Sequence, residues 1–261
     1  MSNSTAPPDR PLEPHSKALI IGASSGIGES LGRLLAEHGY LVALVARREE
    51  SLNDIRDQIN AKIEGFPHAF SYKHDVTHYE EVPELFQQIA ADLGGLDLIV
   101  YMAASQPAMT EDEYNFSKDK EMIEVNTLGA MAWLGQAARR FSTAGAGHIV
   151  GVSSIAGERG RRLNPAYNSS KAALNTYLEA LRNRLSQKGA TVTTIKPGFV
   201  DTALLANASK TMWVISPEKA AEGIFRAIRR RKQVAYVPGR WRLVSLIITH
   251  IPSFIFRRLN I

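Results

Sequence analysis

Short, almost continuously apolar segments alternate with longer amphipathic segments along most of the chain, and this alternation restricts the fold more than any other feature. Strands without polar alternation need cover on both faces, which helices between parallel strands provide. We therefore expect one α/β domain with a doubly wound parallel sheet and helices on both faces, a Rossmann-like arrangement. The predicted strands span residues 17–22, 40–46, 68–76, 96–102, 147–154, 190–198 and 233–238, and the predicted helices 26–39, 49–63, 79–93, 118–141, 165–188 and 217–231.

The size and the two ends of the chain suggest how it is divided. A chain of 261 residues with 44% hydrophobic content is sufficient for one sizeable core. Residues 1–15 contain four prolines and no apolar run, so we expect a flexible lead-in rather than a signal peptide. We assign residues 16–238 to the domain, with a substrate lid near 201–216, and residues 239–261 to a basic, apolar arm. The expected location is cytoplasmic.

The distribution of charged and metal-binding residue types excludes several functions. The chain has no cysteine, and its seven histidines show no metal-binding spacing, so we predict no metal site. Residues 225–261 hold nine of the 31 basic side chains and no acid, which leaves 22 bases against 26 acids elsewhere. Because the body is mildly acidic, we do not expect nucleic acid binding.

The sequence GASSGIG follows the first predicted strand and opens the first predicted helix. Gly22 permits a tight turn, while Gly26 and Gly28 permit close approach of a pyrophosphate to the backbone and of the helix to the sheet. The free N–H groups of a helix N-terminus favour a bound phosphate. We therefore assign the loop to cofactor binding, and its predicted contacts are Gly22, Ser24, Ser25, Gly26, Ile27 and Gly28.

The end of the second predicted strand indicates which dinucleotide fits. Sites that prefer NAD place a carboxylate there to accept from the ribose hydroxyls. This chain has Arg47 and Arg48 instead, and guanidinium groups suit a 2′-phosphate. The expected cofactor is NADP(H), although two solvated arginines at a helix N-terminus are the alternative.

Tyr167 and Lys171 are four residues apart and share one face of a predicted helix, and Ser154 ends the preceding strand. A phenol with a reference pKa near 10 is a poor catalyst at neutral pH. A nearby ammonium and a cationic nicotinamide would lower that pKa, so that Tyr167 could exchange a proton with a substrate oxygen. Ser154 could hold the same oxygen.

The segments GASSGIG, HDVT, VNTLGA, SSIAG, YNSSK and KPGFVDT together resemble the short-chain dehydrogenase/reductase family over residues 16–237. The resemblance implies that Tyr167 is the acid/base and Lys171 its modulator and a ribose ligand. It implies that Ser154 orients the carbonyl and Asn126 supports a proton relay through water. The further cofactor contacts that it implies are Asp75, Val76, Ala103, Pro197, Gly198, Val200 and Thr202.

Two departures from the family pattern lie at neighbouring predicted strands. Ile21 stands where the family has a threonine before the glycine loop, and YMAA, residues 101–104, stands where the family has Asn-Asn-Ala-Gly. We interpret the pair as one linked repacking, with the backbone contacts of Ala103 retained. The catalytic residue types are unchanged.

The lid and the arm carry the predictions about substrate and partners. Leu204, Leu205, Met212, Trp213 and Val214 offer apolar contacts, so we expect a small apolar carbonyl or alcohol substrate. The apolar part of the arm, about 241–256, is shorter than the ~20 residues of a spanning helix. Its arginines and tryptophan suit a membrane surface, and an arm that covers the protein's own core or a partner subunit is the alternative. We also expect a homo-oligomer, a dimer or tetramer.

The leading hypothesis is an NADP-dependent oxidoreductase that transfers hydride between the nicotinamide and a hydrophobic carbonyl/alcohol pair. A dehydratase or epimerase of nucleotide-linked sugars is disfavoured by the short C-terminal region and the glycine spacing. An NADP-binding sensor or scaffold is disfavoured by the intact Ser154, Tyr167 and Lys171, although the YMAA segment leaves it open.

Overall fold

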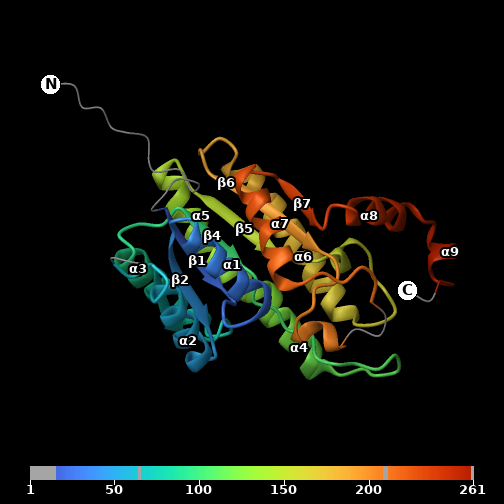
Figure 1. The fold of residues 1–261 in the computed structure, drawn as a ribbon. Helices are drawn as coiled ribbons and strands as arrows, with labels where there is room; N and C mark the ends of the chain where they lie inside the picture. The colour runs from blue at the N-terminus through green and yellow to red at the C-terminus, as the bar shows by residue number, and fades with distance from the viewer. Residues whose placement is uncertain (1–15, 64–65, 208–210, 260–261) are drawn as a thin grey trace.

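The structure is a computed structural model that describes residues 16–63, 66–207 and 211–259. The predicted lead-in, residues 1–15, and part of the predicted lid, residues 208–210, lie outside the described residues. The structure confirms the predicted fold class, a parallel sheet covered by helices on both faces (Figure 1).

The sheet has seven parallel strands in the order β3-β2-β1-β4-β5-β6-β7. The order of the strands reverses between β1 and β4, which lie side by side, and the crevice at such a switch point is where α/β proteins bind ligands. The strands are β1 Lys17–Ile21, β2 Leu41–Ala46, β3 Ala69–Lys73, β4 Leu98–Tyr101, β5 His148–Val152, β6 Thr191–Pro197 and β7 Val234–Val237.

Alternate residues of the strands build two separate cores, one on each face of the sheet. Ala18 and Ile20 pack in the core beneath α1 (Gly26–Glu37), α2 (Glu49–Asn60) and α7 (Pro217–Arg229). Leu19 and Ile21 pack in the core beneath α3 (Val82–Asp92), α5 (Gly129–Ala144) and α6 (Pro165–Leu185). Successive side chains of a strand point to opposite faces, so a strand buried on both faces must be apolar throughout.

The segment predicted as one helix over 118–141 is divided in the structure. It consists of α4 (Phe116–Ile123), one π-helical turn η2 (Glu124–Leu128) and α5, which follow one another directly. The backbone N–H of Gly129 bonds to the carbonyl of Glu124, five residues earlier, which is the π spacing. The insertion shifts the helix register at Asn126, a predicted site residue.

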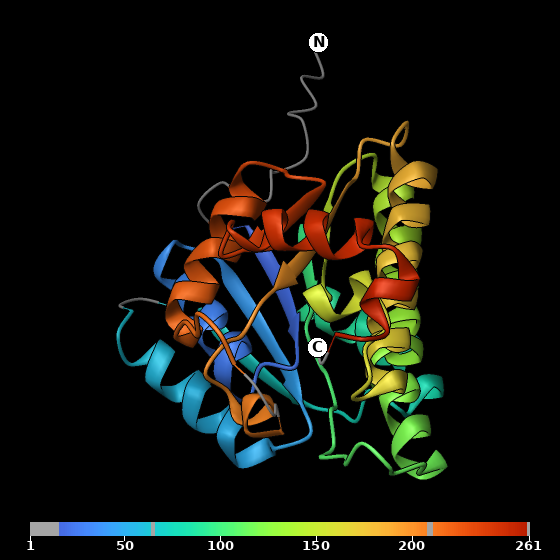
Figure 2. The same ribbon diagram turned by 90° about the vertical axis from the view of Figure 1, so that its right-hand side faces the viewer.

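The chain after β7, which includes the predicted basic, apolar arm, forms helices. These are α8 (Trp241–His250) and α9 (Ser253–Phe256), and both views place them on the outside of the body (Figures 1 and 2). The predicted start of α7 is confirmed, since Ser216 is its N-cap and accepts from the backbone N–H of Lys219 at 3.3 Å. Across the described residues, every helix is too short or too polar to cross a bilayer.

Candidate active site

The glycine loop connects β1 to α1 at the point where the order of the strands reverses. Gly22 and Gly26 have φ angles of 95° and 57°, a region in which a side chain is strained. A β-carbon at Gly22 would lie 2.6 Å from the backbone nitrogen of Ala103, and one at Gly26 would lie 2.9 Å from Cγ2 of Thr202. The structure therefore brings the predicted contacts of β1, β4 and β6 together around one loop.

The first turn of α1 leaves room for an anion. Ser25 is at the N-cap position, but its side chain makes no capping bond and its hydroxyl accepts from Arg48 instead. A β-carbon on Gly28 would clash with the carbonyl oxygen of Gly22, so a close turn requires glycine there. Backbone N–H groups at such a helix start suit a pyrophosphate.

The two arginines after β2 take different positions. The Arg48 guanidinium donates to Ser24 Oγ at 3.0 and 3.1 Å and to Ser25 Oγ at 2.5 Å. Arg47 is 67% exposed, and its Nη1 lies 3.7 Å from a carboxylate oxygen of Asp75. Two cations and two hydroxyls thus gather beside the glycine loop, a donor set that fits a phosphate monoester.

Asp75 and Val76 follow β3 and are predicted cofactor contacts. The Asp75 carboxylate accepts from the N–H and hydroxyl of Thr77, at 3.0 and 2.8 Å. Burial favours a higher pKa for Asp75, but the Thr77 hydrogen bonds and the Arg47 charge outweigh it and lower the pKa. Val76 is buried, so its surroundings are apolar.

Ser154, Tyr167 and Lys171 come from two neighbouring elements, the end of β5 and the first turns of α6. Ser154 has an extended backbone and its hydroxyl accepts from the N–H of Ala156 at 3.0 Å, which fixes its side chain. The Lys171 ammonium lies 5.7 Å from the centre of the Tyr167 ring. The three predicted catalytic groups therefore lie in one place.

The protonation equilibria at this site are dominated by burial. Burial raises the pKa of Tyr167, while a hydrogen bond with Ser154 and the charge of Arg161 act in the opposite direction. Burial also lowers the pKa of Lys171 to about 8. In this structure the Lys171 ammonium is turned to the Val152 carbonyl, at 3.3 Å, so the lowering of the Tyr167 pKa by Lys171 and a bound nicotinamide stays a prediction for the cofactor-bound chain.

Asn126 lies in the π-helical turn and is fully buried. Its amide oxygen accepts from the N–H of Ser105 at 2.8 Å, and its amide nitrogen donates to Ser105 O and Ser170 Oγ, both at 3.0 Å. Ser170 in turn donates to the carbonyl of Tyr167. The Asn126 side chain thus ties the segment after β4 to the catalytic helix.

The two departures from the family pattern are register partners, since Ile21 of β1 pairs with Tyr101 of β4. Tyr101 is fully buried, and its hydroxyl donates to the Val125 carbonyl at 2.6 Å. A β-carbon at Gly129 would lie 2.6 Å from this hydroxyl. Tyr101 therefore connects the sheet to the π-helical turn. This contact agrees with the interpretation of the two departures as one linked repacking.

The loop after β6 is held by the lid and by the arm. A β-carbon on Gly198 would overlap Trp241 Nε1, and Val200 forms a bridge with Ile215. Trp213 of the lid lies 5.5 Å from Trp241, ring centre to ring centre. Trp241 is only 3% exposed. Trp241 therefore packs against the body, in agreement with the alternative in which the arm covers the protein's own core.

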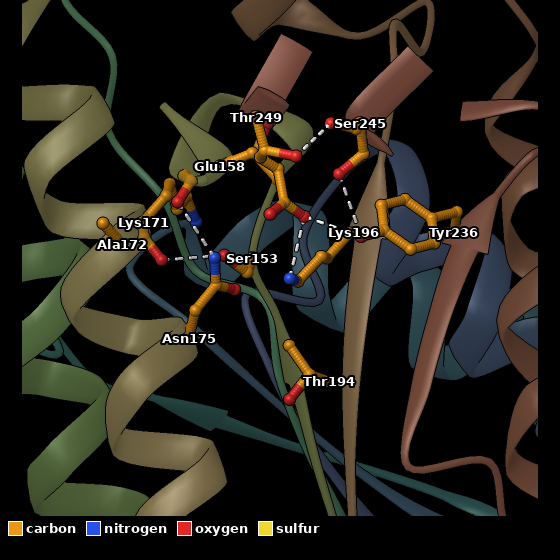
Figure 3. A network of polar contacts seen from close by, with 12 residues as sticks. Ser153, Glu158, Lys171, Ala172, Asn175, Thr194, Lys196, Tyr236, Ser245 and Thr249 are labelled. Carbon is orange, nitrogen blue, oxygen red and sulfur yellow. Dashed lines mark hydrogen bonds and ion pairs between the residues drawn. The ribbon is translucent and has the colours of Figure 1, made fainter. Parts of the chain in front are cut away.

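A half-buried polar network joins the turn after Ser154 to the arm (Figure 3). Glu158 accepts from Lys196 Nζ and from the Tyr236 hydroxyl, both at 2.8 Å. The Tyr236 hydroxyl also contacts Ser245 Oγ of α8 at 3.1 Å. Elements η3 (Ile155–Glu158), β6, β7 and α8 are therefore held together beside the catalytic residues.

Sequence reasoning missed several residues that shape the site. Arg161 acts on the charge of Tyr167, Ser105 and Ser170 hold Asn126, and Glu158 anchors the arm. Arg161 and Glu158 lie between Ser154 and Tyr167 in the sequence, so their position between two predicted catalytic residues could have identified them. The partners of Asn126 are distant in sequence and had no such signal.

The comparisons with known proteins agree with this geometry. The family model for short chain dehydrogenases matches residues 16–213. An uncharacterized oxidoreductase of Mycobacterium tuberculosis is 29% identical over 93% of this chain and 96% of its own. An uncharacterized oxidoreductase of Staphylococcus aureus is 32% identical over 83% of this chain and 92% of its own.

Two solved structures share the fold. A variant of actinorhodin polyketide ketoreductase with NADPH has a TM-score of 0.74 at 24% identity and covers 82% of this chain and 90% of its own. ElxO with NADP bound has a TM-score of 0.78 at 22% identity and covers 88% and 99%. The family match spans most of the described chain, and the chain therefore belongs to the short-chain dehydrogenase family, as an oxidoreductase of that family.

Proposed function

We propose that this oxidoreductase uses NADP(H) to interconvert a small apolar carbonyl and its alcohol, with Tyr167 as the acid/base. The observation that carries the proposal is the meeting of Ser154, Tyr167 and Lys171 at the edge of the sheet where the glycine loop also lies, since both follow the carboxyl ends of parallel strands. In cells NADPH would favour reduction.

The residues of the chain have separate tasks in the proposed reduction. When bound, NADPH would supply the hydride for the carbonyl carbon. The Tyr167 hydroxyl donates its proton to the carbonyl oxygen, and the Ser154 hydroxyl donates a hydrogen bond to the same oxygen. Lys171 supplies positive charge that stabilises the resulting phenolate, and its ammonium is available to a ribose hydroxyl. Asn126 fixes the π-helical turn through Ser105 and Ser170, and thereby the position of α6.

Cofactor selection is supported by the cluster of Arg47, Arg48, Ser24 and Ser25. Arg48 is already directed to the glycine loop, so we assign it the main contact with the 2′-phosphate, with Arg47 beside it. Both structural neighbours carry NADP or NADPH, in agreement with this choice. Arg47→Ala and Arg48→Ala should each raise KM for NADPH far more than for NADH. Equal effects on the two cofactors would refute the phosphate contact. Arg56→Ala, at an arginine of α2 that bonds to Ser71 of β3 instead, is the matched control.

The mechanism is tested by turnover with NADPH and a panel of apolar ketones and aldehydes. Tyr167→Phe should abolish turnover and leave NADPH binding, measured by fluorescence, within a few-fold. Undiminished turnover in this variant would refute the role of Tyr167 as the acid/base. Binding of NADPH by the wild type without turnover of any substrate would instead favour the alternative hypothesis of an NADP-binding sensor or scaffold.

The apolar substrate class is supported by the lid. Leu204 and Leu205 are half-buried, and Met212, Trp213 and Val214 are exposed beside the loop after β6. We also propose a cytoplasmic homo-oligomer, a dimer or tetramer, which light scattering of the purified chain tests directly.

A further inference from the structure

The helices α8 and α9 expose a row of large apolar side chains to solvent. Their side chains are between 42% and 64% exposed, and they define what we call the outer arm face. The members of the outer arm face are Leu243, Leu246, Ile247, Phe254 and Ile255. Single exposed apolar residues are common, but five on two consecutive short helices indicate an interaction surface.

The inner side of α8 shows that this exposure is built in. Ser245 is 4% exposed and faces the body, where its hydroxyl contacts the Tyr236 hydroxyl at 3.1 Å. Leu246 and Ile247, the next residues, point outward. A helix on the surface of a soluble protein normally turns its apolar side inward and its polar side outward. In α8 a serine is buried while leucine and isoleucine are exposed.

The arm is held in this orientation by Arg159, which comes from the turn after Ser154. Its guanidinium donates to the carbonyls of Ile248 and Ile251, at 2.7 and 2.5 Å, which end α8. The same group lies 3.9 Å from the centre of the Phe256 ring. One residue thus fixes both α8 and α9, and the outer arm face is preformed.

Positive charge borders the outer arm face. Arg242, Arg257 and Arg258 are exposed, and within the described ranges no ion pair involves them. From residue 225 to the end of the chain there is no aspartate or glutamate. The face is therefore apolar in the middle and basic at its border. Glu158 lines the same hollow as Leu243 and Leu246, but its carboxylate is paired with Lys196 at 2.8 Å.

We infer that the outer arm face docks on the surface of an anionic lipid bilayer, with its leucine, isoleucine and phenylalanine side chains in the interface and its arginines at the headgroups. Short helices with apolar and basic side chains bind in this way without spanning the bilayer. A symmetric contact between two copies would bring the same arginines together, and like charges would oppose it. An anionic bilayer satisfies both the apolar and the basic groups.

The test is vesicle sedimentation of the full chain without substrate or cofactor, so its result is independent of the proposed reaction. The vesicles are phosphatidylcholine alone, or phosphatidylcholine mixed with phosphatidylglycerol. Wild type should sediment with the anionic vesicles, and less with the neutral ones. Combined Leu246→Ser and Ile247→Ser should weaken the partition by on the order of tenfold or more, because the buried apolar area is lost. Combined Arg257→Gln and Arg258→Gln should weaken it similarly for anionic vesicles only.

Phe116→Ser, at an exposed phenylalanine on α4, is the matched control and should bind like wild type. Circular dichroism shows whether each variant is folded. If the serine variant is unfolded, the arginine variant alone tests the inference. Wild type that stays in the supernatant, or partition that no arm substitution weakens, would overturn the inference. So would light scattering that shows an oligomer dissociated by the serine substitutions without any vesicle binding, since the face would then be a contact between copies.

Discussion

Replacing Lys171 by methionine should make the cofactor-free chain more stable and inactive. Lys171 is 2% exposed, and burial lowers its pKa from 10.5 to about 8. Each pH unit corresponds to 1.36 kcal/mol, so the buried ammonium costs about 3 kcal/mol of folding free energy. The lost hydrogen bond to the Val152 carbonyl, 3.3 Å long, offsets about 1 kcal/mol of the gain. The net stabilisation at neutral pH is thus about 2 kcal/mol.

The pH dependence of this difference identifies its cause. The folded chain binds the Lys171 proton less tightly than the unfolded chain does. The cost is therefore fully present below the folded pKa, about 8, and disappears as the pH rises through 10.5. Near pH 10 about 1 kcal/mol remains, so Lys171→Met and wild type should be about equally stable there. The assay is urea denaturation followed by circular dichroism at pH 7 and at pH 10.

Lys188→Met, at an exposed lysine after α6, is the control and should show the same difference from wild type at both pH values. A Lys171→Met advantage that does not change with pH would contradict the burial argument, and so would a variant less stable than wild type at pH 7. A chain that retains such a cost keeps the charge for function, because a packed apolar side chain would be more stable at this position.

Three further substitutions test other features of the structure. Tyr101→Phe removes the donor to the buried Val125 carbonyl and should cost about 1–3 kcal/mol in urea denaturation; an unchanged midpoint would mean that the carbonyl finds another donor. Arg161→Gln removes a charge that lowers the pKa of Tyr167, so the rise of alcohol oxidation with pH should move to higher pH, and an unmoved profile would contradict the contact. Burial lowers the pKa of His148 to about 3, whereas in the unfolded chain it keeps the ordinary value of 6.5. Below pH 6.5 the unfolded chain therefore binds this proton and the folded chain does not, so wild type loses stability as the pH falls toward 3. His148→Leu should lose less between pH 7 and pH 4.5, measured by urea denaturation, and an equal loss would refute the assignment.

The sheet and the glycine loop were predictable because their signals are local. The inner strands β1, β2, β4 and β5 are buried on both faces, so their apolar runs are visible in the sequence. The structure places every predicted strand within a few residues of its expected bounds. Gly22 and Gly26 were predictable because their backbone conformation excludes other residues. The largest disagreement in the sheet is β3, which ends at Lys73, while its predicted strand extended to residue 76.

The support of the site was not predictable, because it depends on pairs distant in sequence. Tyr101 reaches Val125, and Asn126 reaches Ser105 and Ser170, across separations of 21 to 44 residues. A single sequence shows neither partner. For the same reason the π-helical turn was read as ordinary helix, since its apolar spacing differs by only one residue from the regular pattern.

The composition of the arm does not determine its orientation on the body. Its apolar and basic residues predict an amphipathic segment, but not which side turns inward. That choice depends on Tyr236 and Glu158, which give Ser245 a polar partner in the body, and on Gly198, which leaves space for Trp241. Because Trp241 and Ser245 pack against the body, Leu243, Leu246 and Ile247 of α8 face solvent. The outer arm face is therefore a consequence of how the body binds the other side of the helix.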